Sequence, residues 1–80
     1  MSVFVEAREM IERIKDVISK DTDGFVYDYH VADALDISYS TLRINIMKNK
    51  PPIVKIIIFC RKNGLNIDDF LFNVYKSKQN

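Results

Sequence analysis

The amino-acid sequence predicts an all-α fold, a compact bundle of four to five helices. Three observations support this prediction. Apolar residues recur in several segments with the three-to-four-residue spacing of an amphipathic helix. Turn-forming residues, including both glycines and both prolines, lie between these segments. At 80 residues, 48% of them hydrophobic and 29% charged, the chain has the size and composition of a single folded domain over residues 1–80.

The first helix is expected over residues 5–20. Its apolar positions follow helical spacing with charged residues between them; they are Ala7, Met10, Ile11, Ile14, Val17 and Ile18. Ser2 is a possible cap at its start. The turn formers around Gly24 end the helix near Lys20.

Residues 21–28 form a linker between this helix and the next. Phe25, Val26 and Tyr27 are apolar enough to pack, and could form either a short extended piece or an early helix turn. Asp28 suits the N-cap position of the helix that follows, because its carboxylate can accept hydrogen bonds from the free amides of a first turn.

A helix, a tight turn and a second helix are expected over residues 29–48, the arrangement called a helix-turn-helix. Val31, Ala32 and Leu35 share one face of the first of these helices, and the small Ala32 allows a close helix crossing. Asp36 falls where the backbone needs a positive φ. Asp and Asn tolerate that conformation better than other residues apart from glycine.

The second helix of the pair spans about residues 39–48. Leu42 and Ile46 form its inward face, and Ser38 or Ser40 can cap its start. The side chains that a DNA major groove would meet first are those at its start and on its outer face, namely Ser38, Tyr39, Ser40, Arg43 and Ile44. The alternative is an ordinary helical hairpin in which the two serines are caps only.

A further helix is expected over residues 52–63. Pro51 precedes it, Pro52 suits its first turn and Gly64 follows it, and these signals outweigh the strand propensity of its isoleucines. Its inward stripe is expected to be Ile53, Ile56, Ile57 and Cys60, with Phe59 beside it.

The last helix is expected over about residues 67–76, with Asn66 and Asp69 as a capping pair. This helix is apolar on more than one side, so apolar surface would remain after it covers the core. Such a surface suggests a second copy of the chain as partner. The expected homodimer contacts are Phe70, Phe72, Val74 and Tyr75. The alternative is that Phe72 and Tyr75 only close the small core.

The net charge of +1 hides an asymmetry between the two halves of the chain. Residues 1–40 carry four basic and nine acidic residues, a net charge of −5, whereas residues 41–80 carry eight basic and two acidic residues, a net charge of +6. Six cations and no acid lie from Arg43 to Lys62. A basic stretch of this kind favours a polyanionic partner, with a solvated surface as the alternative.

Several classes of function are disfavoured. The longest apolar run, residues 56–60, is far too short to cross a bilayer. Cys60 is the only cysteine, so we expect a packed thiol in a cytoplasmic protein. His30 lacks a second ligand at metal-binding spacing, and the chain shows neither a nucleophile paired with a base nor a phosphate-binding glycine loop. We therefore expect no enzymatic activity, cofactor, metal or small-molecule substrate, and no membrane partner.

Three segments resemble the helix-turn-helix domain of phage CI-type repressors, within the lambda-repressor-like group. They are MIERIKDVI, VADALDISYSTLRINIMKNKPP and IIIFCRKNGLNIDDFLF, and the resemblance covers roughly residues 8–72. It implies a bundle of four to five helices that binds operator DNA as a dimer and controls transcription in a bacterium or its phage. Asp36 stands where the family usually has glycine, and Asn45 where it often has a large aromatic residue.

On this interpretation the helix at about 39–48 lies in the major groove of double-stranded DNA, with the five outward side chains at base edges. The expected phosphate contacts are His30, Thr41, Lys48 and Lys50. In a dimer the two such helices lie about one DNA turn apart, ~34 Å, at a near-palindromic site. The alternative is a protein-interaction module of the same fold that does not bind DNA.

Overall fold

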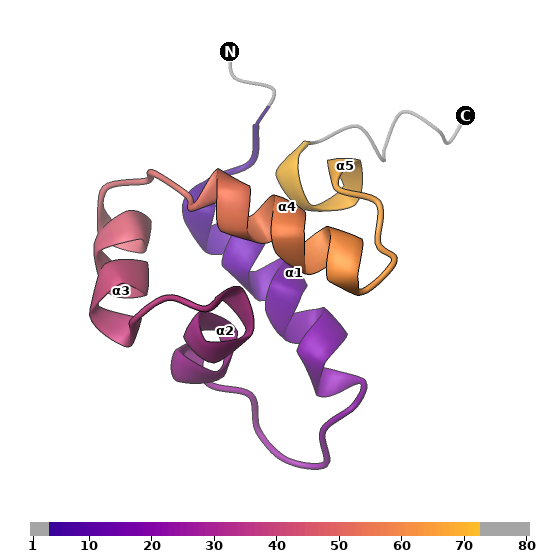
Figure 1. Cartoon of the computed structure of the whole chain (residues 1–80). Helices are drawn as coiled ribbons and strands as arrows, with labels where there is room; N and C mark the ends of the chain where they lie inside the picture. Colours follow the sequence, from indigo (N-terminus) through magenta and orange to yellow (C-terminus); the bar gives the residue numbers. More distant parts are fainter. Residues whose placement is uncertain (1–3, 73–80) are drawn as a thin grey trace.

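Five α-helices make up the regular secondary structure of residues 4–72, the part of the chain that the structure, a computed structural model, describes. They are α1 (Ala7–Ser19), α2 (Asp28–Leu35), α3 (Tyr39–Met47), α4 (Ile53–Lys62) and α5 (Asp68–Leu71). α2 packs against α1, α3 and α4, and α1 also packs against α3 and α5 (Figure 1). The predicted all-α class is therefore confirmed for the described residues.

Every helix contributes apolar side chains to one core. The buried helical residues are Ala7, Met10, Ile11 and Ile14 from α1; Val31, Ala32 and Leu35 from α2; Leu42 from α3; Ile56, Phe59 and Cys60 from α4; and Phe70 and Leu71 from α5. The predicted inward faces of α1 and α2 are confirmed, with Val17 and Ile18 partly buried at the end of α1. Ala32 is 1% exposed, which fits the predicted close packing of α2 on its neighbours.

The chain enters α1 through a short extended segment, so the helix starts two residues later than predicted. The backbone N–H of Val5 donates to the carbonyl of Leu71 over 2.9 Å, and Phe4 forms an isolated antiparallel bridge with Phe72. The Phe4 and Phe72 rings stack with centroids 4.9 Å apart. This pairing holds residues 4 and 5 out of the helix. The possible cap Ser2 lies outside the described residues.

The start of α2 also differs by one residue from the prediction. The helix begins at Asp28, and Tyr27, not Asp28, occupies the N-cap position. The backbone N–H of Tyr27 donates to Nδ1 of His30 over 2.9 Å, so the histidine closes the first turn. Asp28 lies inside the helix, where its carboxylate pairs with cations of α1 instead.

The turn between α2 and α3 follows the sequence prediction. Asp36 has φ of 61° in the left-handed region. The N–H of Ile37 donates to the carbonyl of Ala32 over 3.0 Å, which closes the end of α2. Ile37 itself is partly buried against the core. Only three residues therefore separate the two helices.

The inward stripe of α4 was predicted incorrectly at one position. Ile57 is 37% exposed, and Phe59 is buried instead. Successive helical residues are about 100° apart, so a stripe centred on Ile56 and Cys60 includes Phe59 and leaves Ile57 at its edge. Together with Val54 and Ile58, Ile57 forms an exposed aliphatic face. Gly64, with φ of 65°, ends the helix segment as predicted.

The last helix is much shorter than predicted within the described residues. α5 comprises Asp68–Leu71, and Phe72 is already extended. The guanidinium of Arg13 donates to the carbonyls of Asp69 and Phe72, at 2.9 and 3.1 Å, and so satisfies carbonyls that a longer helix would use internally. Phe70 is 6% exposed and belongs to the core. The predicted dimer contacts Val74 and Tyr75 lie outside the described residues.

Within residues 4–72 no helix has both the length and the apolar character required to cross a membrane.

Candidate nucleic-acid interface

α3 is attached to the core by one side only. Leu42 is fully buried, Asn45 and Ile46 are partly buried, and the other side chains of the helix are exposed at the edge of the molecule (Figure 1). All five side chains predicted at its start and outer face are exposed: Ser38, Tyr39, Ser40, Arg43 and Ile44. The inward face predicted for this helix is therefore confirmed, and its outward face is free of the core.

Ser38 is the N-cap of α3, and its hydroxyl group is engaged in the cap hydrogen bonds. Its Oγ accepts a hydrogen bond of 3.0 Å from the N–H of Thr41 and donates one of 2.8 Å to Thr41 Oγ1. Of the two predicted caps, Ser38 is thus the one used. The exposed Ser40 follows it in the first turn of the helix.

Tyr39 and Arg43 form a pair on the outer face. The guanidinium carbon of Arg43 lies 5.9 Å from the centroid of the Tyr39 ring, within the range of a cation–π contact. This contact restricts the conformations of the Arg43 side chain. A side chain that is already restricted loses less conformational entropy when it contacts a ligand.

Met47 belongs to the same face and was missed by the sequence analysis. It is 77% exposed and lines a pocket of about 340 Å³ together with Tyr39 and Arg43. The spacing i, i+4, i+8 from Tyr39 through Arg43 to Met47 places all three in one row of the helix surface. An exposed thioether at the end of that row adds an adaptable apolar contact.

Two exposed cations follow the C-terminal end of α3. Lys48 is its C-cap and Lys50 comes two residues later. Asn49 between them has φ of 53°, and the N–H of Lys50 donates to the carbonyl of Asn45 over 2.9 Å. This Schellman-type ending fixes the backbone that carries both lysines, near the helix end where positive charge is favoured.

His30, the remaining predicted phosphate contact, lies on α2 and not beside the lysines. It is half-buried, and its Nδ1 already accepts the hydrogen bond from Tyr27. Its ring centroid is 4.4 Å from that of Tyr29. Nε2 is the ring nitrogen left for an external ligand.

An ion-pair network joins α1 to the start of α2, close to this face. Asp28 accepts from Lys15 at 2.8 Å and from Arg8 at 3.4 Å. Glu12 pairs with the same two cations, at 3.1 Å to Arg8 and 3.5 Å to Lys15. Burial raises the pKa of Asp28, but the hydrogen bonds and charges of Lys15 and Arg8 outweigh it, so that pKa lies below its ordinary value.

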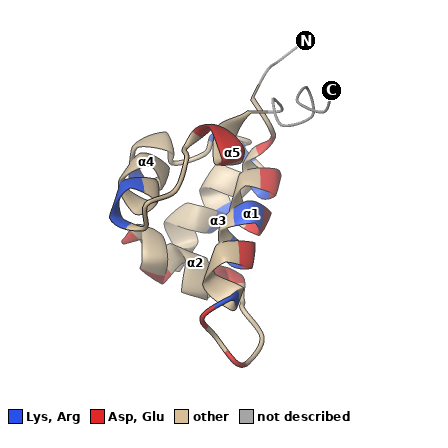
Figure 2. Ribbon diagram, turned by 90° about the vertical axis from the view of Figure 1, so that its right-hand side faces the viewer, with Lys and Arg blue, Asp and Glu red and all other residues tan. Residues whose placement is uncertain are grey.

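The basic stretch predicted from sequence is mostly at the surface. Its members are Arg43, Lys48, Lys50, Lys55, Arg61 and Lys62, and all but the half-buried Lys55 are exposed. Figure 2 shows basic residues at one end of α4, whereas both signs of charge alternate along α1. α3 and α4 together therefore present an excess of positive charge.

Cys60 is a packed thiol, as predicted. It is 1% exposed, and burial, with a smaller effect of Asp69, raises the pKa of its thiol. Its thiol is thus neutral at physiological pH and shielded from reagents.

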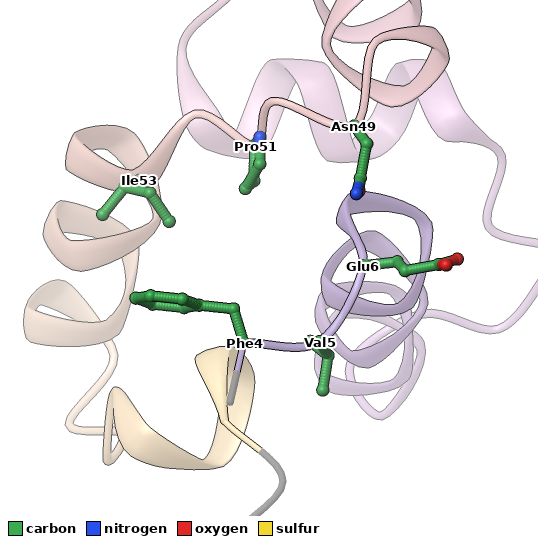
Figure 3. A pocket seen from close by; sticks show the side chains of 6 residues that line it. All are labelled: Phe4, Val5, Glu6, Asn49, Pro51 and Ile53. Atoms are coloured by element: carbon green, nitrogen blue, oxygen red, sulfur yellow. The ribbon is translucent and has the colours of Figure 1, made fainter. Parts of the chain in front are cut away.

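A second pocket, of about 510 Å³, lies between the segment that follows α3 and the starts of α1 and α4 (Figure 3). It is lined by Phe4, Val5, Glu6, Asn49, Pro51 and Ile53. Glu6 is the one titratable residue in this lining, and most of the wall is apolar. In residues 4–72 no three His, Cys, Asp or Glu side chains gather closely enough to hold a metal ion.

Comparison of the chain with protein-family models, curated proteins and solved structures gives no match.

Proposed function

We propose that this protein is a sequence-specific DNA-binding regulator of transcription, similar to phage CI-type repressors, and that α3 enters the major groove. The observation that carries the proposal is the row of exposed side chains on α3, formed by Tyr39, Arg43 and Met47. The three-residue turn before α3 and the cations after it support the same assignment. The resemblance to the phage repressor domain adds to this support.

Each group on this surface has a chemical role in the proposal. The guanidinium fork of Arg43 matches the two acceptors of guanine, and Ile44 suits the thymine methyl group. Tyr39 and Ser40 supply hydroxyl groups to base edges or phosphates. Lys48 and Lys50 neutralise phosphates and so contribute affinity without sequence preference.

Thr41 and His30 can contact phosphates, although each already uses one of its hydrogen-bonding positions within the protein. The Thr41 hydroxyl already accepts a hydrogen bond from Ser38, and it retains its own O–H for a phosphate oxygen. His30 offers Nε2 only. Ser38, as the cap, positions the helix and makes at most an additional contact.

Dimerisation on a near-palindromic site is part of the proposal. Phe70 is buried in the core, and Phe72 is half-buried and stacked on Phe4. These two residues therefore expose little of the surface area that a dimer interface needs. The proposed regulator acts in the cytoplasm on double-stranded DNA and needs no cofactor and no membrane.

Fluorescence anisotropy with a labelled random duplex at about 50 mM salt tests the proposal, because non-specific binding by a DNA-binding protein is strongest at low salt. We expect binding that weakens linearly in log affinity against log salt. Selection of bound duplexes from a random library should then yield a recurring sequence. Absence of any duplex binding at low salt would favour the protein-interaction module instead.

A further inference from the structure

Four exposed aromatic side chains gather at the starts of α2 and α3. Phe25 is 77% exposed, Tyr27 49%, Tyr29 50% and Tyr39 44%. We call these four residues the aromatic ledge. Phe25 and Tyr27 are apolar enough to pack, but the structure places both at the surface.

The ledge is continuous. The Tyr27 and Tyr29 rings stack with centroids 5.5 Å apart, and Phe25 meets Tyr27 edge-on at 5.4 Å. Tyr39 lines the same hollow of about 560 Å³ as the other three. Since Tyr39 is also the first residue of the exposed row on α3, the ledge extends the proposed DNA-binding surface beyond that helix.

The core does not explain this arrangement. Phe59 and Phe70 are buried, whereas the ledge rings are exposed and make their ring contacts at the surface, Tyr27 with Phe25 and Tyr29, and Tyr29 with His30. Exposed apolar patches are typical of interaction sites, and tyrosine is enriched at interfaces because its ring is apolar and its hydroxyl can find a hydrogen-bond partner.

The carboxylates that line the hollow beneath the ledge are ion-paired. Glu12 and Asp28 line the hollow, but each is paired with Arg8 and Lys15. Two carboxylates and two cations leave this network neutral. This network therefore adds no net charge that would repel a phosphate group at the phenol hydroxyls.

We propose that the aromatic ledge binds the sugar–phosphate backbone of the DNA strand next to the groove that α3 enters. The hydroxyls of Tyr27, Tyr29 and Tyr39 donate to phosphate oxygens, and the Phe25 ring packs on deoxyribose. The inference rests on the proposed function, because a duplex that covers Arg43 also covers the neighbouring Tyr39.

Phosphate contacts from phenol hydroxyls and from lysines differ in their dependence on salt concentration. A phenol that contacts a phosphate releases no counterion, so its loss lowers the affinity and leaves the salt dependence unchanged. A lysine that contacts a phosphate contributes about 0.9 to the slope of log affinity against log salt. The two kinds of contact can therefore be separated in one titration series.

The experiment compares the wild-type protein with the Tyr27→Phe/Tyr29→Phe double variant, which removes only two exposed hydroxyls. Anisotropy is measured from 50 to 200 mM salt on the selected duplex and on a random one. We expect affinity for both duplexes to fall roughly threefold to tenfold per hydroxyl, with an unchanged slope. The Lys48→Gln/Lys50→Gln variant is the contrast, with a slope reduced by about 1.8. Circular dichroism confirms that each variant is folded.

The outcomes are distinct. A double variant that binds both duplexes like the wild type overturns the inference and leaves the proposed function intact; this is also the result if the ledge binds another protein. A double variant with both a lower affinity and a smaller slope of log affinity against log salt overturns the inference as well, because a smaller slope would show that charged contacts were lost. If the wild type binds no duplex at 50 mM salt, the proposed function fails and the inference fails with it.

Discussion

The side-chain oxygen Oδ1 of Asn49 accepts a hydrogen bond of 2.7 Å from the backbone N–H of Ala7, 42 positions away in the sequence. Ala7 is the first residue of α1, and its N–H has no partner within the helix. Asn49 also ends α3 through its positive φ of 53°. One residue therefore closes the proposed DNA-contacting helix and fixes that end of it to the longest helix of the core.

Substitutions at Asn49 should separate these two roles. Asn49→Gly keeps the left-handed backbone and removes the cap, so we expect the free energy of unfolding to fall by about 1 kcal/mol. Asn49→Ala removes the cap and strains the backbone as well, and about 2 kcal/mol should be lost. Asn49→Asp retains an acceptor at a helix N-terminus and should stay near the wild type. Urea unfolding measures all three; equal losses for Gly and Ala would show that the φ of Asn49 carries no cost.

Asn45 offers a route to a more stable protein. Its Oδ1 is buried and has no hydrogen-bond partner among the residues that the structure describes. A buried acceptor without a partner costs about 1–3 kcal/mol, and leucine has a similar volume without a polar atom. We expect Asn45→Leu to raise the free energy of unfolding by about 1 kcal/mol in urea. Asn45→Asp is the control and should destabilise the protein, since it buries a charge; a less stable leucine variant would contradict the assignment.

Local rules were sufficient to predict the parts of the fold that depend on neighbouring residues. The buried stripe of α1, the left-handed Asp36 and the stop at Gly64 each follow from the chemistry of a few adjacent positions. The error at Ile57 has the same origin, because neighbouring apolar residues share the edge of a stripe and packing decides between them.

Contacts between distant residues could not be predicted in this way. Nothing near Asn49 in the sequence indicates Ala7 as its partner, and Arg13 reaches carbonyls more than fifty positions away. The exposure of Arg43 on α3 was predictable from helical spacing. The exposure of Phe25 and Tyr27 in the aromatic ledge was not, since apolar residues in a linker are equally consistent with packing and with exposure until the helices around them are placed.

Because Asp28 is ion-paired in the folded protein, the free energy of unfolding should depend on pH in the acidic range. Its pKa in the folded protein lies below the ordinary value of 3.8, so the carboxylate stabilises the fold above the unfolded-state pKa, and this contribution is lost as the pH falls through the folded-state pKa. Asp28→Asn should therefore be less stable than the wild type at pH 7, and the difference should shrink below about pH 4. Urea unfolding from pH 7 to pH 2 measures the two curves.

Lys15 provides the matched control for that series. Its ammonium is the nearer partner of Asp28, at 2.8 Å. Lys15→Met retains an apolar stem and removes the charge, so it should remove much of the same acid-dependent stability. A Lys15→Met curve parallel to the wild type from pH 7 to pH 2 would assign the effect to Arg8 instead.

Arg43 is the residue on which sequence preference should depend most. If its guanidinium contacts a guanine, Arg43→Ala should weaken binding to the selected duplex by about 1–3 kcal/mol and relax the preference at one base position. Arg43→Lys should recover the part of the binding free energy that comes from charge, but not the preference for one base, because an ammonium lacks the two parallel N–H donors of a guanidinium. Arg61→Ala makes the same charge change on the exposed surface of α4 and should have a much smaller effect. Anisotropy on the selected and random duplexes distinguishes these outcomes; equal losses for the two alanine variants would show that Arg43 acts only through its charge.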